Sequence, residues 1–131
     1  MLECVVNIAA GAGPALDALA AACGEALLDR HADTDHDRSV FTLAGPADGD
    51  AESAALALAA AAAAHLDLAT RPEGVHPRLG VVDVVPFVAL GQPANTAVAA
   101  AHRAGAHLAE ELAVPVFFYD DADPAGRSLP T

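Results

Sequence analysis

The segment CVVNIAAGAGPALDALAAACG, residues 4–24, decides the fold. Its opening run, Cys4–Ile8, is short and β-branched and ends at two nearby glycines, a pattern typical of a strand. Pro14 favours the first turn of a helix because its fixed φ suits that position, and Gly24 is a typical helix stop. Three residues share one apolar helical stripe between these limits: Leu16, Leu19 and Cys23.

The same alternation of strands and helices continues along the chain. The alanine-rich run after Asp48 or Asp50 predicts the clearest helix, because alanine has the highest helix propensity. Residues 30–37 read as a polar loop. The alanine-rich helix is expected to run to about residue 69. Further strands are expected at 26–29, 39–44, 81–90 and 114–119. A last helix is expected to begin at a cap of Asn95 or Thr96, with an apolar stripe of Val98, Ala101, Gly105, Leu108 and Leu112.

The order β-α-β-β-α-β-α-β begins with the split β-α-β pattern. We therefore predict an α+β fold, a ferredoxin-like split β-α-β sandwich with an extra helix and strand. Its helices would lie on one face of a mixed or antiparallel sheet, in a single domain of residues 1–131 with 119–131 as a loose tail. The uncovered sheet face would need a ligand, a partner or a second domain, so we expect a homo-oligomer, for example a homodimer.

Composition excludes several classes of partner. The chain has 131 residues, six arginines, no lysine and 18 acids, for a formal charge of −12. That charge argues against binding nucleic acid or an anionic membrane surface. Two cysteines cannot form a disulfide framework, and no targeting segment is visible, so we expect a cytoplasmic protein.

Two polar residues interrupt apolar strands. Asn7 and Asp83 would be costly to bury without partners, so each is expected to face a neighbouring polar group or a pocket. For Asp83 the simpler interpretation is a hydrogen bond to backbone or a pair with an arginine, and the alternative is a carboxylate facing a site. Pro86 indicates an edge position or an irregularity in the same strand.

The segment GVHPRLG, residues 74–80, carries a candidate site. Pro77 restricts His76 to an extended backbone, Arg78 offers a fork of donors suited to a carboxylate, and Gly80 allows close approach to the backbone. A loop histidine can move protons near neutral pH, although a lone surface histidine is more often without a function.

A second polar cluster comprises His31, Asp33, Asp35 and His36. Its spacing matches no strong metal-binding motif, and acidic loops are common in so acidic a chain. We therefore predict no bound structural metal.

Four segments together resemble one family, glutamate formiminotransferase, in its N-terminal subdomain. The resemblance covers nearly the whole chain in order. It rests on Glu3-Cys4-Val5-Val6-Asn7; Leu27-Leu28-Asp29 with Asp33-Thr34-Asp35-His36-Asp37-Arg38-Ser39-Val40; His76-Pro77-Arg78-Leu79-Gly80 with Asp83 and Pro86-Phe87-Val88; and Glu110-Glu111-Leu112 with Val114-Pro115-Val116.

The resemblance implies an activity and a site. The family is a transferase of histidine degradation and one-carbon metabolism. It moves a formimino group from N-formimino-L-glutamate to N5 of tetrahydrofolate, a co-substrate. His76 matches the family's catalytic histidine and would be the general acid/base, with Arg38 and Arg78 binding substrate carboxylates. Asn7, Gly80 and Asp83 complete the expected substrate site.

Departures from the family pattern leave alternatives open. The family's C-terminal subdomain is not expected within these residues, so a second-subdomain protein is a candidate partner. Ala9 and Ala10 replace a serine and a glutamate, Val75 replaces a glutamate, and His31 stands where an acid is common. Three hypotheses follow: a formiminotransferase-type enzyme, a non-catalytic folate- or glutamate-binding module, and an oligomerising structural homologue. The losses argue against turnover by this chain alone.

Overall fold

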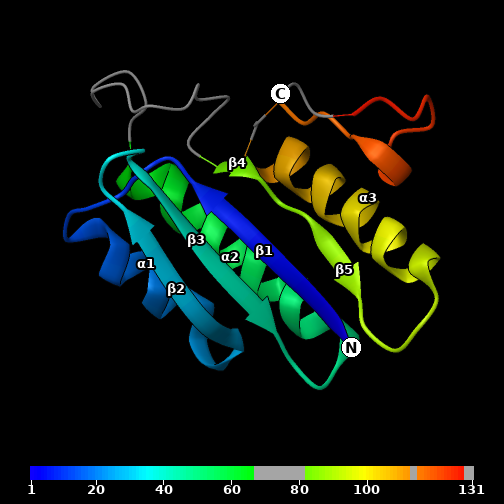
Figure 1. Cartoon of the computed structure of the whole chain (residues 1–131), viewed down its shortest axis with the longest axis horizontal. Coiled ribbons are helices and arrows are strands. Elements are labelled where there is room, and N and C mark those ends of the chain that lie inside the picture. Colours follow the sequence, from blue (N-terminus) through cyan, green and yellow to red (C-terminus); the bar gives the residue numbers. More distant parts are fainter. Residues whose placement is uncertain (67–81, 113–114, 129–131) are drawn as a thin grey trace.

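The structure, a computed structural model, describes residues 1–66, 82–112 and 115–128 (Figure 1). The elements follow the order predicted from the sequence as far as the third helix. Their bounds are β1 (Leu2–Ile8), α1 (Ala15–Cys23), the short 3-10 helix η1 (Gly24–Ala26), β2 (Leu27–Asp33), β3 (Arg38–Ala44), α2 (Asp48–His65), β4 (Val82–Val84), β5 (Phe87–Ala89), α3 (Ala94–Glu111) and η3 (Asp120–Ala122).

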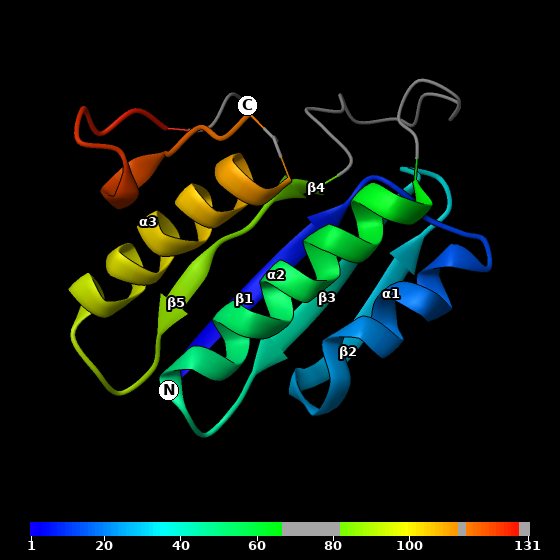
Figure 2. The same cartoon turned by 180° about the vertical axis from the view of Figure 1, so that it is seen from behind.

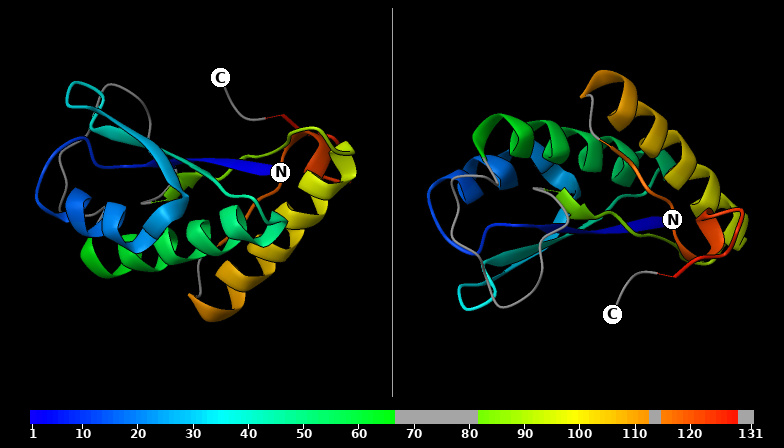
Figure 3. Two further views of the ribbon diagram at one scale, coloured as in Figure 1. Left: turned by 90° about the horizontal axis from the view of Figure 1, so that it is seen from below. Right: turned by 90° about the horizontal axis from the view of Figure 1, so that it is seen from above.

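The described strands form one antiparallel sheet in the order β2-β3-β1-β4, and β5 also pairs with β1. This order is that of the split β-α-β sandwich, so the predicted fold class is confirmed. All three helices lie on the same side of the sheet, with α3 at the β5 edge (Figures 2 and 3). The opposite face, which we call the open face, carries no helix in the described residues.

The alternation of β1 sorts its side chains between the two faces. Residues at even positions from Leu2 to Ile8 are buried under the helices, and Glu3, Val5 and Asn7 are half-buried on the open face. The strand therefore contributes both to the core and, through Asn7, to the open face.

Helices α1 and α2 cover the core as the sequence predicts. The expected stripe of α1 is buried, and Gly24 ends the helix with φ 60°. The cap of α2 differs, because Ala47 holds the N-cap position and Asp50, three residues later, accepts the Ala47 N–H at 3.0 Å. One face of α2 is buried, consisting of Ala51, Ala54, Ala55, Leu58, Ala59 and Ala62.

Other details of the sequence-based assignment were wrong as well. Helix α3 has Pro93 at its N-cap position rather than Asn95 or Thr96. Strand β2 continues to Asp33, through part of the expected loop, and pairs with β3 up to the Asp33–Arg38 register. The expected strand at 81–90 is split into β4 and β5 around Pro86, whose carbonyl still accepts the Val5 N–H at 3.1 Å. The buried stripe of α3 is Ala97, Ala100, Ala104, Gly105 and Leu108, rotated from the expected one.

The last strand expected from the sequence is not observed in the described residues 115–119. Described residues 115–119 lie outside the sheet and run along α3, with Val116 and Phe118 beside Gly105. His102 bonds the Ala122 carbonyl at 2.7 Å and contacts the Phe118 ring edge-on. The described helices include none that is long and apolar enough to cross a membrane.

Candidate functional site

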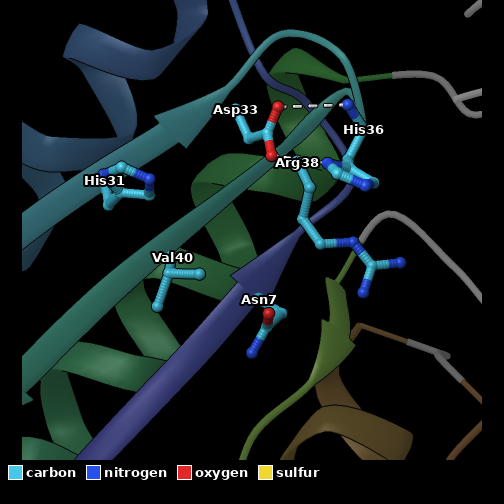
Figure 4. Close-up of a pocket in the computed structure, with 6 residues that line it drawn as sticks. All are labelled: Asn7, His31, Asp33, His36, Arg38 and Val40. Atoms are coloured by element: carbon cyan, nitrogen blue, oxygen red, sulfur yellow. Dashed lines mark hydrogen bonds and ion pairs between the residues drawn. The ribbon is translucent and has the colours of Figure 1, made fainter. Parts of the chain in front are cut away.

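A shallow pocket of about 340 Å³ opens on the open face where β2, β3 and β1 lie side by side (Figure 4). Strand register builds it, because Val40 of β3 pairs with Asn7 of β1 on one side and His31 of β2 on the other. Six residues line it: Asn7, His31, Asp33, His36, Arg38 and Val40.

Arg38 and Asp83 form an ion pair that connects the start of β3 with the middle of β4. Arg38 Nη2 lies 2.5 Å from Asp83 Oδ2, and the Asp83 side chain is only 3% exposed against 23% for Arg38. Asp83 Oδ1 is also buried and has no hydrogen-bond partner among the described residues. Such an acceptor is costly unless a donor reaches it, so the geometry suits an N–H group from a ligand or a neighbouring side chain.

The turn between β2 and β3 is ordered by Asp33. Its Oδ1 accepts the N–H groups of Asp35 and His36, and its Oδ2 lies 2.5 Å from His36 Nδ1. The hydrogen bond from the His36 side chain is the largest cause that lowers the pKa of Asp33, followed by the His36 N–H. Asp33 is therefore ionised at neutral pH.

The same turn is locked against the loop after β1. Asp37, with φ 49°, accepts the Gly11 N–H at 2.8 Å, and the buried Ser39 hydroxyl donates to the Ala10 carbonyl. Gly11 lies so close that a Cβ there would be 2.2 Å from the Asp33 carbonyl oxygen. Only glycine fits this approach, so the turn and the pocket edge have a fixed position.

The structure brings together three of the sequence-predicted site residues: Asn7, Arg38 and Asp83 lie at one end of the open face. Three others, His76, Arg78 and Gly80, fall outside the described residues. The expectation that Asp83 pairs with an arginine is met by Arg38.

Sequence reasoning missed a pocket role for His31, Asp33 and His36. It treated them as a weak metal candidate, and the described part of the chain contains no group of three or more potential ligands arranged for a metal. The signal that could have found them is alternation: residues 29, 31 and 33 share one face if the strand continues past residue 29.

Every arginine in the described residues is bound to a carboxylate. Besides the Arg38 pair, the structure shows Arg30 with Asp17, Arg103 with Glu52 and Arg127 with Asp123. In the part of the chain that the structure describes, the basic groups are thus already largely neutralised. Much of the hydrogen-bonding capacity that remains for a ligand in the pocket therefore comes from imidazole and amide groups.

A match to a known family agrees with this architecture. The model of the formiminotransferase domain, N-terminal subdomain, matches residues 1–131. The chain belongs to this family. Glutamate formimidoyltransferase of Streptococcus pyogenes serotype M1 is 35% identical over 128 residues, which cover 93% of this chain and 42% of the relative.

Longer relatives match this formiminotransferase subdomain equally well. Formimidoyltransferase-cyclodeaminase of Sus scrofa is 38% identical and that of Gallus gallus 36% identical, each over 138 residues that cover 99% of this chain and 25% of the relative. The chain thus spans less than half the length of these curated relatives.

Proposed function

We propose that this subdomain takes part in transferring a formimino group from N-formimino-L-glutamate to N5 of tetrahydrofolate. The observation that carries the proposal is the family match over residues 1–131, with relatives named as formimidoyltransferases. The pocket on the open face supports it, because Asn7 and Arg38 line it and Asp83 pairs with Arg38. The reaction would belong to histidine degradation and folate-linked one-carbon metabolism in the cytoplasm.

The chemistry is an exchange of one amine for another on an amidine carbon. N5 of the folate attacks that carbon, a tetrahedral intermediate forms, and the bond to the glutamate nitrogen breaks. N5 loses a proton and the departing nitrogen gains one, so a group with the protonation behaviour of imidazole suits the step. We assign that role to His76, with tetrahydrofolate as co-substrate rather than a resident cofactor.

The substrate contacts follow from charge and hydrogen bonding. Arg38 and Arg78 would bind substrate carboxylates, and Asn7 and Gly80 would line the ligand. Asp83 already pairs with Arg38 through one oxygen, and its other buried oxygen suits an N–H donor. The donor set therefore fits a ligand that carries both carboxylates and N–H groups.

Calorimetry with tetrahydrofolate and N-formimino-L-glutamate, alone and together, tests this proposal on the full chain. His76→Ala should abolish transfer while altering affinity less, and Arg78→Ala should mainly weaken binding. Absence of heat at millimolar ligand would remove both the enzyme and the ligand-binding hypotheses.

A second candidate function is a non-catalytic or oligomerising subdomain. The open face favours it, because Val5, Val40 and Val84 are only half-buried there and Val88 is 42% exposed. We propose a homo-oligomer or a complex with a protein that supplies a second subdomain. Light scattering at micromolar concentrations that gives a monomer would contradict the first of these.

A further inference from the structure

Asp33 binds more than its turn requires. An aspartate that closes such a turn needs one carboxylate oxygen, and Oδ1 fills that role by accepting two backbone N–H groups, at 2.9 and 3.2 Å. The second oxygen, Oδ2, is placed 2.5 Å from Nδ1 of the His36 ring. Turn formation therefore does not account for the contact between the carboxylate and the imidazole.

That contact fixes the chemical form of the His36 ring. Because the Asp33 carboxylate is ionised and can only accept, Nδ1 carries the hydrogen and donates it. Nε2 is then the ring nitrogen that Asp33 does not engage. Carboxylates that hold a histidine in this way set its tautomer and ring orientation, as in hydrolytic triads.

The ring also has a fixed place in the pocket. It is 33% exposed, and it lines the pocket together with Arg38 and Asn7 (Figure 4). The bond between Asp37 and Gly11 and the close contact at Gly11 hold the turn that carries it. A proton-transfer group needs such a fixed position, because reach and orientation decide its efficiency.

We propose that His36 is a second catalytic imidazole, which protonates the departing nitrogen of glutamate. This inference rests on the proposed function. Transfer needs a base at N5 and an acid at the glutamate nitrogen. N5 attacks the amidine carbon, the N5–C bond forms and His76 takes the N5 proton. The tetrahedral intermediate then loses glutamate: its C–N bond breaks as the His36 Nε2–H protonates the departing nitrogen, so His36 takes over the acid half of the role assigned above to His76. No redox partner is needed.

Pocket size supports the glutamate side of the reaction. Its 340 Å³ lies near the lower end of the range of ligand pockets, about 300–1,000 Å³, and is large enough for an amino-acid-sized group.

The first experiment is NMR of the full chain with isotopically labelled histidine nitrogens. In the unliganded protein we expect His36 to show a hydrogen on Nδ1, and Asp33→Asn should abolish that preference. Millimolar N-formimino-L-glutamate should shift the His36 Nε2 signal and leave that of the exposed His107 unchanged. A ring whose only hydrogen is on Nε2, or ligand binding without a shift at His36, would overturn the inference alone.

Transfer kinetics of the chain, measured together with a protein that supplies the second subdomain, give the second measurement. His36→Gln should lower kcat by about 100- to 10,000-fold with little change in KM, the usual contribution of a general acid. His31→Gln is the matched control, because it removes an imidazole from the same pocket that has no carboxylate partner among the described residues. Equal losses for the two variants would refute a special role for His36. Failure of the unmodified chain to bind either substrate would instead refute the proposed function, and this inference with it.

Discussion

Arg38→Ala should destabilise the fold far more than Arg30→Ala, which breaks an exposed ion pair. The variant leaves the Asp83 carboxylate, 3% exposed, without its charged partner. Breaking a buried ion pair from one side costs about 3–5 kcal/mol, and we take about 3 kcal/mol because Arg38 itself is 23% exposed. With a urea dependence of about 1.5 kcal/mol per molar, the unfolding midpoint should fall by roughly 2 M.

Removing the other partner of the ion pair, by Asp83→Ala, should cost less stability. Asp83→Ala removes the orphaned oxygen together with the ion pair, and the long Arg38 side chain can turn its guanidinium towards water. We expect a loss of roughly 1–2 kcal/mol in this case. The asymmetry between the two variants is specific to a pair in which one partner is buried and the other is partly exposed.

Urea unfolding followed by circular dichroism measures both changes. The control is Arg30→Ala, because the Arg30–Asp17 pair is largely exposed, with side chains 36% and 82% accessible, and should contribute about 0–1 kcal/mol. A double variant, Arg38→Met with Asp83→Leu, should recover much of the loss. If Arg38→Ala cost no more than Arg30→Ala, the inference that Asp83 depends on Arg38 would be refuted.

Three further outcomes are expected. Gly11→Ala should destabilise by about 1–3 kcal/mol in urea, because its Cβ would overlap the facing strand, while Gly49→Ala, with open space in a helix, should stabilise slightly. The hydrogen bond from the Arg127 side chain lowers the pKa of Asp123, so the stability that this pair gives to the segment along α3 should persist at neutral pH. That stability should be lost when the pH drops below about 4, which fluorescence of the single tyrosine would report. The variant Asp123→Asn should show no such transition. Burial raises the pKa of the Cys4 thiol strongly and that of Cys23 to about 11, so a thiol reagent should label either only after denaturant is added; rapid labelling of the native chain would contradict their burial.

The core was predictable where side chains differ in size and polarity. The stripe of α1 and the alternation of β1 follow directly from sequence, because leucine, valine and isoleucine alternate there with polar or small residues. Helix α3 is harder, since alanines lie on several of its faces. The stripe inferred from Val98 and Leu112 is therefore displaced from the buried one, where small residues let α3 approach its neighbours closely.

The candidate site was predictable only in part, for a related reason. Asn7 and Asp83 stood out because each interrupts an apolar strand. His31 and Asp33 lie on an edge strand whose open face needs no apolar side chains, so their polarity suggested a loop. The position of Arg38 opposite Asp83 depends on the pairing of three strands, which no local pattern in the sequence specifies.

The pairing of the described arginines has a consequence for how ligands arrive. An exterior with a formal charge of −12, whose described cations each sit against a carboxylate, repels a dicarboxylate or a folate before contact is made. Dissolved salt weakens that long-range repulsion, because the screening length shortens to about 8 Å at physiological ionic strength. Encounter between this subdomain and an anionic ligand should therefore quicken as salt is added, the opposite of the behaviour of proteins that attract their ligands by charge.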